Sequence, residues 1–299
     1  MDAPPELVTG VLPAVVSIEA SIKPGHPSAG ALGTERRSTG VIVDTGGYLL
    51  TVNYVVLGAY FFGIGLQDGR RFQGQLVAQD FSSGLAVLKI PPQDLPAVRL
   101  GSSMDILLGQ PVFVAAATGP VERRIADGVI GYLGEFDTHW EFMLHKVIGL
   151  TIQNPGFGGA PVFDLAGRVV GIASFSLPEV TRATIAIPVE RYQLNRTELL
   201  EFGQVVSRPT RAWIGAHLQP AERGVLVAAV VPGGPAEAAG VKEGDVIVAV
   251  GFCAVETRRD LYEELWKKRA HEKVSLKIVR EERTIVVDVV TGSSEEFYK

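Results

Sequence analysis

The sequence predicts a mainly β protein in which a larger β-rich part is followed by a smaller part that mixes strands and helices. Between about residues 11 and 188, short apolar runs alternate with glycine, proline, aspartate and serine. This spacing is typical of an all-β barrel or sandwich and not of alternating strands and helices. A polar segment, VSRPTR, then separates this part from a second apolar pattern. With 299 residues, the chain is long enough for two or three domains, each with its own core.

The strands of the first part are expected at the apolar runs between turn residues. The clearest runs are AVVSIEA, GVIVD, GYLLTVNYVV, GLAVLKI, PVFVAAA, GRVVGIASF and TIAIP. No charge lies between Asp44 and Asp68, but Asn53 and five glycines interrupt this stretch. We therefore assign it to buried strands and not to a membrane span. After Pro188, apolar residues among charged ones predict a short closing helix over residues 189–205.

The second part is expected to combine five strands with two helices. The strands are predicted at AWIGAHL, GVLVAAVV, GDVIVAV, KVSLKIV and TIVVDVV, and a small helix at PAEAAG. A longer helix is predicted over residues 257–269, where Thr257 can cap the first turn and Asp260 favours the positive end of the helix. Leu261 and Leu265 are four residues apart and share one face of this helix.

Composition excludes several classes of function. The net charge of −5 argues against a nucleic-acid partner, which needs a basic face. The single cysteine, Cys253, excludes an intrachain disulfide and lies in an apolar run, which favours burial. The histidines are scattered singly without metal-ligand spacing, so we assign no metal and no cofactor. The N-terminal MDAPPELVTG lacks the basic start and apolar run of a signal peptide. Membrane attachment is therefore expected only through a segment absent from this chain.

Four segments, in this order, resemble the HtrA (Deg) family. They are STGVIVDTGGYLLTVNYVV, DGRRFQGQLVAQDFSSGLAVLKI, NPGFGGAPVFDLAGRVVGI and GVLVAAVVPGGPAEAAGVKEGDVIVAV. The first three are similar to the family's T-N-x-H-V-V, D-L-A-V-L-K and N-P-G-N-S-G-G-P stretches, and the fourth is similar to the core of a PDZ domain. The resemblance implies a chymotrypsin/trypsin-like double β-barrel with its closing helix over residues 1–205. It also implies a linker at 206–211 and a small α+β PDZ domain over 212–299.

The resemblance fails at the three positions that carry the family's chemistry. Tyr54 stands where the family has its histidine base, Gly84 where it has the orienting aspartate, and Gly158 where it has the nucleophilic serine. Glycine offers no attacking atom, and a phenol with a pKa near ~10 is no general base at neutral pH. These residues predict a pseudoprotease with a degenerate triad, that is, no enzyme. Gly156 and Phe157 are expected as the remnant of the oxyanion loop, and Phe157 is expected to pack against Tyr54.

The PDZ-like part has an intact predicted site. In such domains an extended peptide adds as a strand to the sheet edge, and backbone N–H groups of a short loop receive its terminal carboxylate. By resemblance, the loop is AWIGA, in which a side chain in place of Gly215 would crowd the carboxylate. The long helix forms the opposite wall, although its leucines could equally belong to the core. The predicted peptide-binding residues are Trp213, Ile214, Gly215, Ala216, Leu261, Tyr262 and Leu265.

These observations leave three classes of function. The first, which we favour, is a catalytically inactive HtrA-like protein that binds peptides or protein C-termini through its PDZ domain, as scaffold, chaperone or regulatory partner in protein quality control. The second is an active serine-type endopeptidase that uses other residues. The third is a non-catalytic subunit that assembles with an active HtrA paralogue. The resemblance further implies self-association as a trimer. It also implies an extracytoplasmic location, in the bacterial periplasm or at a membrane anchor, or an organellar one.

Overall fold

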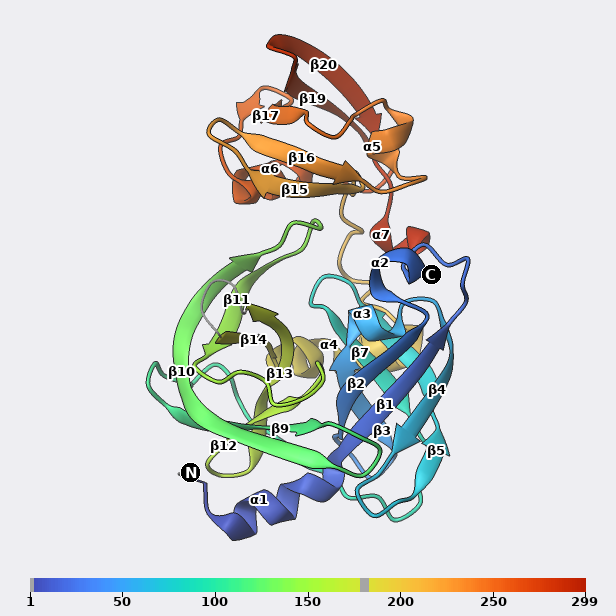
Figure 1. Ribbon diagram of the computed structural model, residues 1–299, viewed down its shortest axis with the longest axis vertical. Helices are drawn as coiled ribbons and strands as arrows, with labels where there is room; N and C mark the ends of the chain where they lie inside the picture. Colours follow the sequence, from blue (N-terminus) through green and yellow to red (C-terminus); the bar gives the residue numbers. More distant parts are fainter. Residues whose placement is uncertain (1–2, 178–182) are drawn as a thin grey trace. The chain divides into compact units, whose positions relative to one another are not determined.

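The computed structural model describes residues 3–177 and 183–299, and the chain forms two compact units (Figure 1). The first, here called the barrel unit, consists of the residues up to Gly134 together with Lys146–Val206. The second, here called the C-terminal unit, consists of Ser207–Lys299 together with Glu135–His145. The predicted boundaries at 205 and 212 did not assign residues 135–145 to the C-terminal unit.

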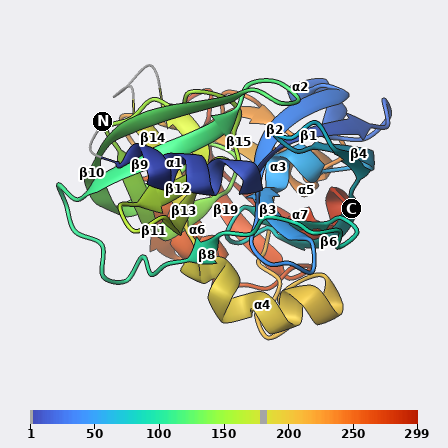
Figure 2. The ribbon, with the colours of Figure 1, turned by 90° about the horizontal axis from the view of Figure 1, so that it is seen from below.

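The barrel unit contains two seven-stranded sheets, which lie side by side in Figures 1 and 2. In pairing order the first sheet consists of β5 (Arg71–Gln73), β4 (Ala59–Gly65), β1 (Val15–Ile22), β2 (Glu35–Ile42), β3 (Tyr48–Val52), β7 (Leu85–Lys89) and β6 (Gln75–Asp80). The second consists of β12 (Pro161–Asp164), β9 (Pro111–Ala117), β10 (Arg123–Asp137), β11 (Met143–Leu150), β14 (Ala183–Pro188), β13 (Arg168–Leu177) and β8 (Arg99–Leu100). Because β12 also pairs with β13, the second sheet closes on itself as a barrel.

The apolar runs of the sequence form buried strands of these sheets. Phe113 on β9 and Phe163 on β12 are cross-strand partners, and their buried rings stack with centroids 5.0 Å apart. The uncharged stretch between Asp44 and Asp68 forms β3, a short helix and β4, as expected for sheet core. No helix among the described residues is long and apolar enough to span a bilayer.

Helices connect and close the barrel unit. They are α1 (Pro5–Val11), the 3₁₀ turn η1 (Leu12–Ala14), α2 (Ala29–Leu32), α3 (Asn53–Val56) and α4 (Glu190–Phe202). The predicted closing helix is confirmed in α4, which ends at Gly203 in the left-handed conformation that glycine adopts without strain.

The C-terminal unit is a small α+β fold. Its sheet has the order β15 (Ala216–Pro220), β16 (Val225–Val230), β17 (Val246–Val250), β19 (Lys273–Arg280) and β20 (Arg283–Val290), and β18 (Cys253–Ala254) pairs with β17. Its helices are α5 (Pro235–Ala238), α6 (Arg258–Leu265) and α7 (Ser294–Phe297). The predicted fold class, a mainly β barrel part followed by a small α+β part, is confirmed.

Two local predictions for this unit need correction and one is confirmed. The helix predicted over residues 257–269 ends earlier, at Leu265. Cys253 is exposed and not buried, because its short strand pairs at the end of β17, outside the apolar cluster. The predicted cap is confirmed as a capping box: the Thr257 hydroxyl accepts the Asp260 N–H at 3.1 Å, and the Asp260 carboxylate accepts the Thr257 N–H at 2.9 Å.

Candidate functional site

The structure brings the segments that carry Tyr54 and Gly84 together. Tyr54 lies in α3, directly after β3, and the backbone N–H of Asn53 donates to the carbonyl of Gly84 at 2.7 Å. Gly84 lies in the turn between β6 and β7 with a φ of +79°, a conformation that favours glycine. Strand β3 pairs with β7, which is why residues so far apart in sequence meet.

Gly158 lies next to the hydroxyl group of Tyr54. A Cβ atom built at position 158 would collide with the Tyr54 hydroxyl, so the phenol occupies the space that a side chain there would take. The turn itself is firmly held, because the Gly158 carbonyl accepts the Thr39 N–H at 2.8 Å and the Ser38 hydroxyl at 2.7 Å. The fold therefore brings the three predicted triad positions to one place.

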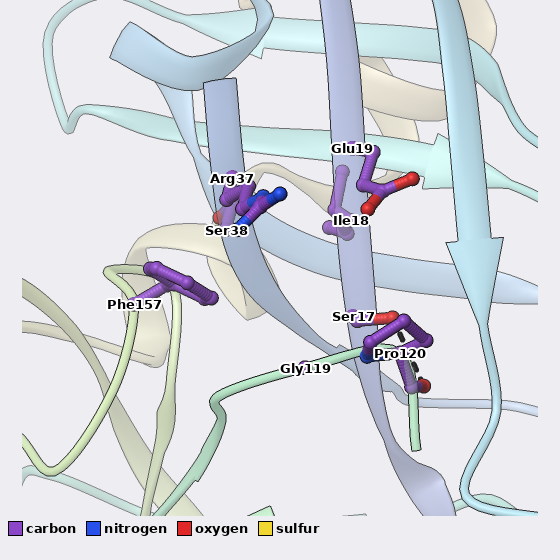
Figure 3. A pocket seen from close by; sticks show the side chains of 8 residues that line it. All are labelled: Ser17, Ile18, Glu19, Arg37, Ser38, Gly119, Pro120 and Phe157. Atoms are coloured by element: carbon purple, nitrogen blue, oxygen red, sulfur yellow. Dashed lines mark hydrogen bonds between the residues drawn. The ribbon is translucent and has the colours of Figure 1, made fainter. Parts of the chain in front are cut away.

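The remaining residues of this turn bond within the barrel unit. The Gly156 N–H donates to the Asn154 Oδ1 at 3.2 Å, and the Phe157 N–H donates to the Ala117 carbonyl at 3.3 Å. The Phe157 ring faces a small pocket of about 100 Å³ (Figure 3). The other lining residues are Ser17, Ile18, Glu19, Arg37, Ser38, Gly119 and Pro120.

The expected packing of Tyr54 against Phe157 is wrong. The ring of Tyr54 instead contacts Phe175, with ring centroids 6.0 Å apart, and its hydroxyl donates to the Ser174 carbonyl at 3.1 Å. Burial raises the pKa of Tyr54 to about 12, so the phenol is protonated at neutral pH and acts as a hydrogen-bond donor. A buried phenol and two glycines thus occupy the three positions.

A second site lies in the C-terminal unit at the predicted loop. The backbone N–H groups of Ile214, Gly215 and Ala216 converge on one point. Gly215 has a φ of +76°, and a Cβ there would approach the Trp213 ring to 3.1 Å. The positive φ favours glycine at this position, and the crowding of a bound carboxylate by a side chain stays a prediction. The backbone of Trp213 pairs with Gly292, and its ring lies beside Gly215 and packs on Phe297 of α7.

A carboxylate already occupies this loop. Glu141, at the tip of the β10–β11 hairpin and within the same compact unit, accepts the Ile214 N–H at 3.0 Å, the Gly215 N–H at 2.7 Å and the Ala216 N–H at 2.9 Å. Burial raises the pKa of Glu141 to about 7, although the three N–H groups act in the opposite direction. The residue has a φ of +56°, so the chain adopts an unfavourable conformation to direct this side chain inward.

The predicted helix wall lies opposite the loop. Leu261, Tyr262 and Leu265 are all fully buried, and the two leucines belong to the apolar cluster of the C-terminal unit. Tyr262 faces the hairpin, because its hydroxyl donates to the Thr138 carbonyl at 2.6 Å and accepts the Glu141 N–H at 3.1 Å. The contact of the hairpin with the loop was not predicted, because no local signal marks an acidic residue that meets a loop more than seventy positions away.

Comparison with known proteins agrees with both units. The pattern of the trypsin-like peptidase domain matches residues 38–172, and that of the PDZ domain matches residues 212–291. A probable periplasmic serine endoprotease DegP-like from Halomonas elongata is 32% identical over 293 residues, which is 89% of this chain and 59% of the relative. The chain belongs to the HtrA (Deg) family.

Further relatives of this family are similar to the chain. The corresponding DegP-like protein of Hahella chejuensis is 31% identical over 85% of this chain and 57% of its own length. A putative serine protease HhoA of Synechocystis is 28% identical over 86% of this chain and 70% of its own length. Among solved structures, the HtrA-type protease AlgW with decapeptide has a TM-score of 0.58 and 26% identity, covering 96% of this chain and 97% of that one. The chain spans under 60% of the length of the two DegP-like relatives.

These relatives correct one prediction. The expectation that the chain is no enzyme is contradicted, because the curated proteins that it matches are named serine endoproteases or a serine protease. The chain combines a trypsin-like peptidase domain with a PDZ domain, as its family does. The assignment of Tyr54, Gly84 and Gly158 to the triad positions stays a prediction.

Proposed function

We propose that this HtrA-family protein binds extended peptides with a free C-terminal carboxylate in its PDZ domain, between β15 and α6. The observation that carries the proposal is the convergence of the Ile214, Gly215 and Ala216 N–H groups on one carboxylate. Three backbone donors in a glycine-containing loop form a concave anion site whose geometry is fixed without any basic side chain. AlgW, the similar solved structure, is described with a decapeptide. Through such binding the protein would act as scaffold, chaperone or regulatory partner for protein C-termini.

The chemistry around the loop defines the expected ligand. Ile214, Leu218, Leu261 and Leu265 are fully buried members of one apolar cluster beside the loop. A peptide whose last residue is apolar would bury that side chain against this cluster while its carboxylate meets the loop. β15 is the edge strand of its sheet, so it can pair with the peptide backbone.

A titration of the intact protein with a decapeptide library tests the proposal. Each fluorescein-labelled peptide ends in a free Val, Leu, Ile, Phe or Ala, and the matched control carries the same sequence with a C-terminal amide. The best free-acid peptides are expected to bind with a Kd of roughly 1 μM, or about −8 kcal/mol, and the amides at least ~10-fold more weakly. No saturable signal from any library member, or equal binding of acids and amides, would show that the assignment is wrong.

The names of the relatives support two further parts of the proposal. Two are named periplasmic, which supports an extracytoplasmic location for this chain. We also propose partnership with a second copy or with an active HtrA paralogue. Light scattering of the purified protein tests self-association, and the mass of a trimer is the expected result. Copurification of a tagged chain with an HtrA protease tests partnership with a paralogue. A monomer that retains no HtrA protease contradicts both kinds of partnership.

The same names favour endopeptidase activity as a second candidate function. Because Gly158 has no attacking atom, this activity would use another nucleophile. Cleavage of fluorogenic casein above buffer, abolished by a serine-directed phosphonate, is the supporting result. Turnover indistinguishable from buffer would count against it.

A further inference from the structure

We propose that the tip of the β10–β11 hairpin, residues 137–143, is a built-in ligand of the peptide groove, which an external C-terminal peptide must displace. This segment is here called the hairpin tip. It belongs to the same compact unit as the groove that it occupies. The inference rests on the peptide-binding function proposed above and adds how access to that site is controlled.

The first anchor of the hairpin tip is the carboxylate of Glu141. One oxygen accepts the Gly215 and Ala216 N–H groups and the other accepts the Ile214 N–H, with distances of 2.7 to 3.0 Å. These are the donors that a peptide's terminal carboxylate would use. Since an N–H group serves one strong acceptor at a time, Glu141 and an external carboxylate exclude each other.

The second anchor is the backbone, which meets the edge of β15. The Leu218 N–H donates to the His139 carbonyl at 2.7 Å. Alternate residues of a strand direct their N–H groups to the same edge, so Ala216 and Leu218 face the hairpin tip together. Pro220, the next residue in this alternation, has no N–H. The edge donors of β15 are thus engaged with the hairpin tip, as they would be with an added peptide strand.

The third anchor is the wall formed by α6. The Tyr262 hydroxyl bonds to the hairpin backbone on both sides, with Thr138 as acceptor and Glu141 as donor. Met143, the last residue of the hairpin tip, is buried in the apolar cluster that also contains Leu261 and Leu265. The hairpin tip therefore supplies the two features expected of a ligand, a carboxylate and an apolar side chain.

Charged pairs surround these contacts. Arg258 donates to Asp137 at 2.7 Å, and Arg259 meets Glu135, next to the hairpin tip, at 2.5 Å. Both pairs are partly exposed, so salt screens them and they contribute little to the docked state. We therefore assign the specific part of the docking to Glu141, Tyr262 and the edge of β15.

Self-occupation lowers the apparent affinity for every external peptide by the same factor. If the docked form outnumbers the open form tenfold, the apparent Kd is about elevenfold higher than that of the open groove. Removal of the Glu141 carboxylate shifts the equilibrium toward the open form. Binding of an external peptide should then become tighter although no contact to that peptide has been added.

The test compares matched variants of the intact protein with the fluorescein-labelled decapeptide that binds best in the library. Glu141→Gln keeps the size but replaces one acceptor oxygen with an NH2 group, which cannot accept an N–H of the loop, and Glu141→Gly removes the side chain while accommodating the positive φ. Glu263→Gln removes an exposed carboxylate from α6 and is the control. Both Glu141 variants are expected to bind the peptide about tenfold or more tightly than wild type, and Glu263→Gln is expected to match wild type. Equal affinity of the wild type and both Glu141 variants would overturn the proposal.

Amide hydrogen exchange separates this proposal from the peptide-binding function. In the protein without peptide, the N–H groups of Ile214, Gly215, Ala216 and Leu218 should exchange slowly, and at least about tenfold faster in Glu141→Gly. Equal exchange in wild type and variant would refute docking of the hairpin tip, whatever the peptides do. If instead no library peptide binds any variant while the exchange difference is present, the peptide-binding function fails and the docked hairpin tip stands.

Discussion

Acidification should close the peptide groove, because Glu141 holds its proton more tightly when docked. Its pKa is raised by burial from 4.5 to about 7 in the docked form. Because Glu141 has the higher pKa in the docked form, protonation of Glu141 stabilises that form. The stabilisation is complete below the ordinary pKa of 4.5 and is lost as the pH rises through about 7. Between pH 8 and pH 6, proton linkage therefore favours docking by a factor of about 10, or ~1.4 kcal/mol.

The assay is the same fluorescence titration at pH 8, 7 and 6. The peptide's own carboxylate, with a pKa near ~3.5, stays ionised throughout. The apparent Kd for the external peptide is expected to rise by up to about tenfold from pH 8 to pH 6 in wild type, and to stay nearly constant in Glu141→Gln.

Other titratable groups near the hairpin tip define the control. Burial raises the pKa of Tyr262 and Tyr298, so both stay protonated in this range. Burial lowers the pKa of His139 and His217, so their charge changes mainly toward the acid end. A pH dependence of the same size in Glu141→Gln would assign the effect to the histidines and refute the reasoning, as would a flat wild-type profile.

Two stability predictions follow from the packing. Gly158→Ala should destabilise the protein by about 1–3 kcal/mol, because its Cβ collides with the Tyr54 hydroxyl. In urea denaturation, Tyr54→Phe should lower the free energy of unfolding by about 1 kcal/mol, because the hydrogen bond to Ser174 is lost. In the double variant, Tyr54→Phe should restore part of the stability that Gly158→Ala removes, because the hydroxyl that meets the new Cβ is absent. Strict additivity of the two changes would refute the collision. Thr257→Ala should cost about 1 kcal/mol, since Asp260 loses half of its capping box; an unchanged urea midpoint would argue against the cap.

The features that were predicted from sequence are those set by neighbouring residues. The capping box joins Thr257 and Asp260, three residues apart, so it could be inferred from the sequence directly. Likeness to the family's motifs singled out Tyr54, Gly84 and Gly158, and the fold brings the segments that carry them together. Both inferences depend only on the order of residues within a short segment. Neither requires knowing which way a side chain points in the folded protein.

The features that were missed depend on long-range contacts. Tyr54 packs against Phe175 on β13, and the side-chain rotamer that produces this contact cannot be inferred from sequence. Glu141 is an acidic residue, and exposure to solvent is the usual outcome for such a side chain. Only the meeting of the hairpin with the Ile214–Ala216 loop turns this residue into a buried ligand.

For the peptide binding proposed above, Pro220 limits the number of peptide residues whose backbone can pair with β15. Since the edge of β15 presents donors at Ala216 and Leu218 and none at Pro220, main-chain recognition stops within a few residues of the partner's end. A tripeptide should therefore capture most of the affinity of a decapeptide. Many unrelated proteins with a short apolar C-terminus would then compete for the same groove. The groove would therefore bind protein C-termini with low sequence specificity and would not select a single partner.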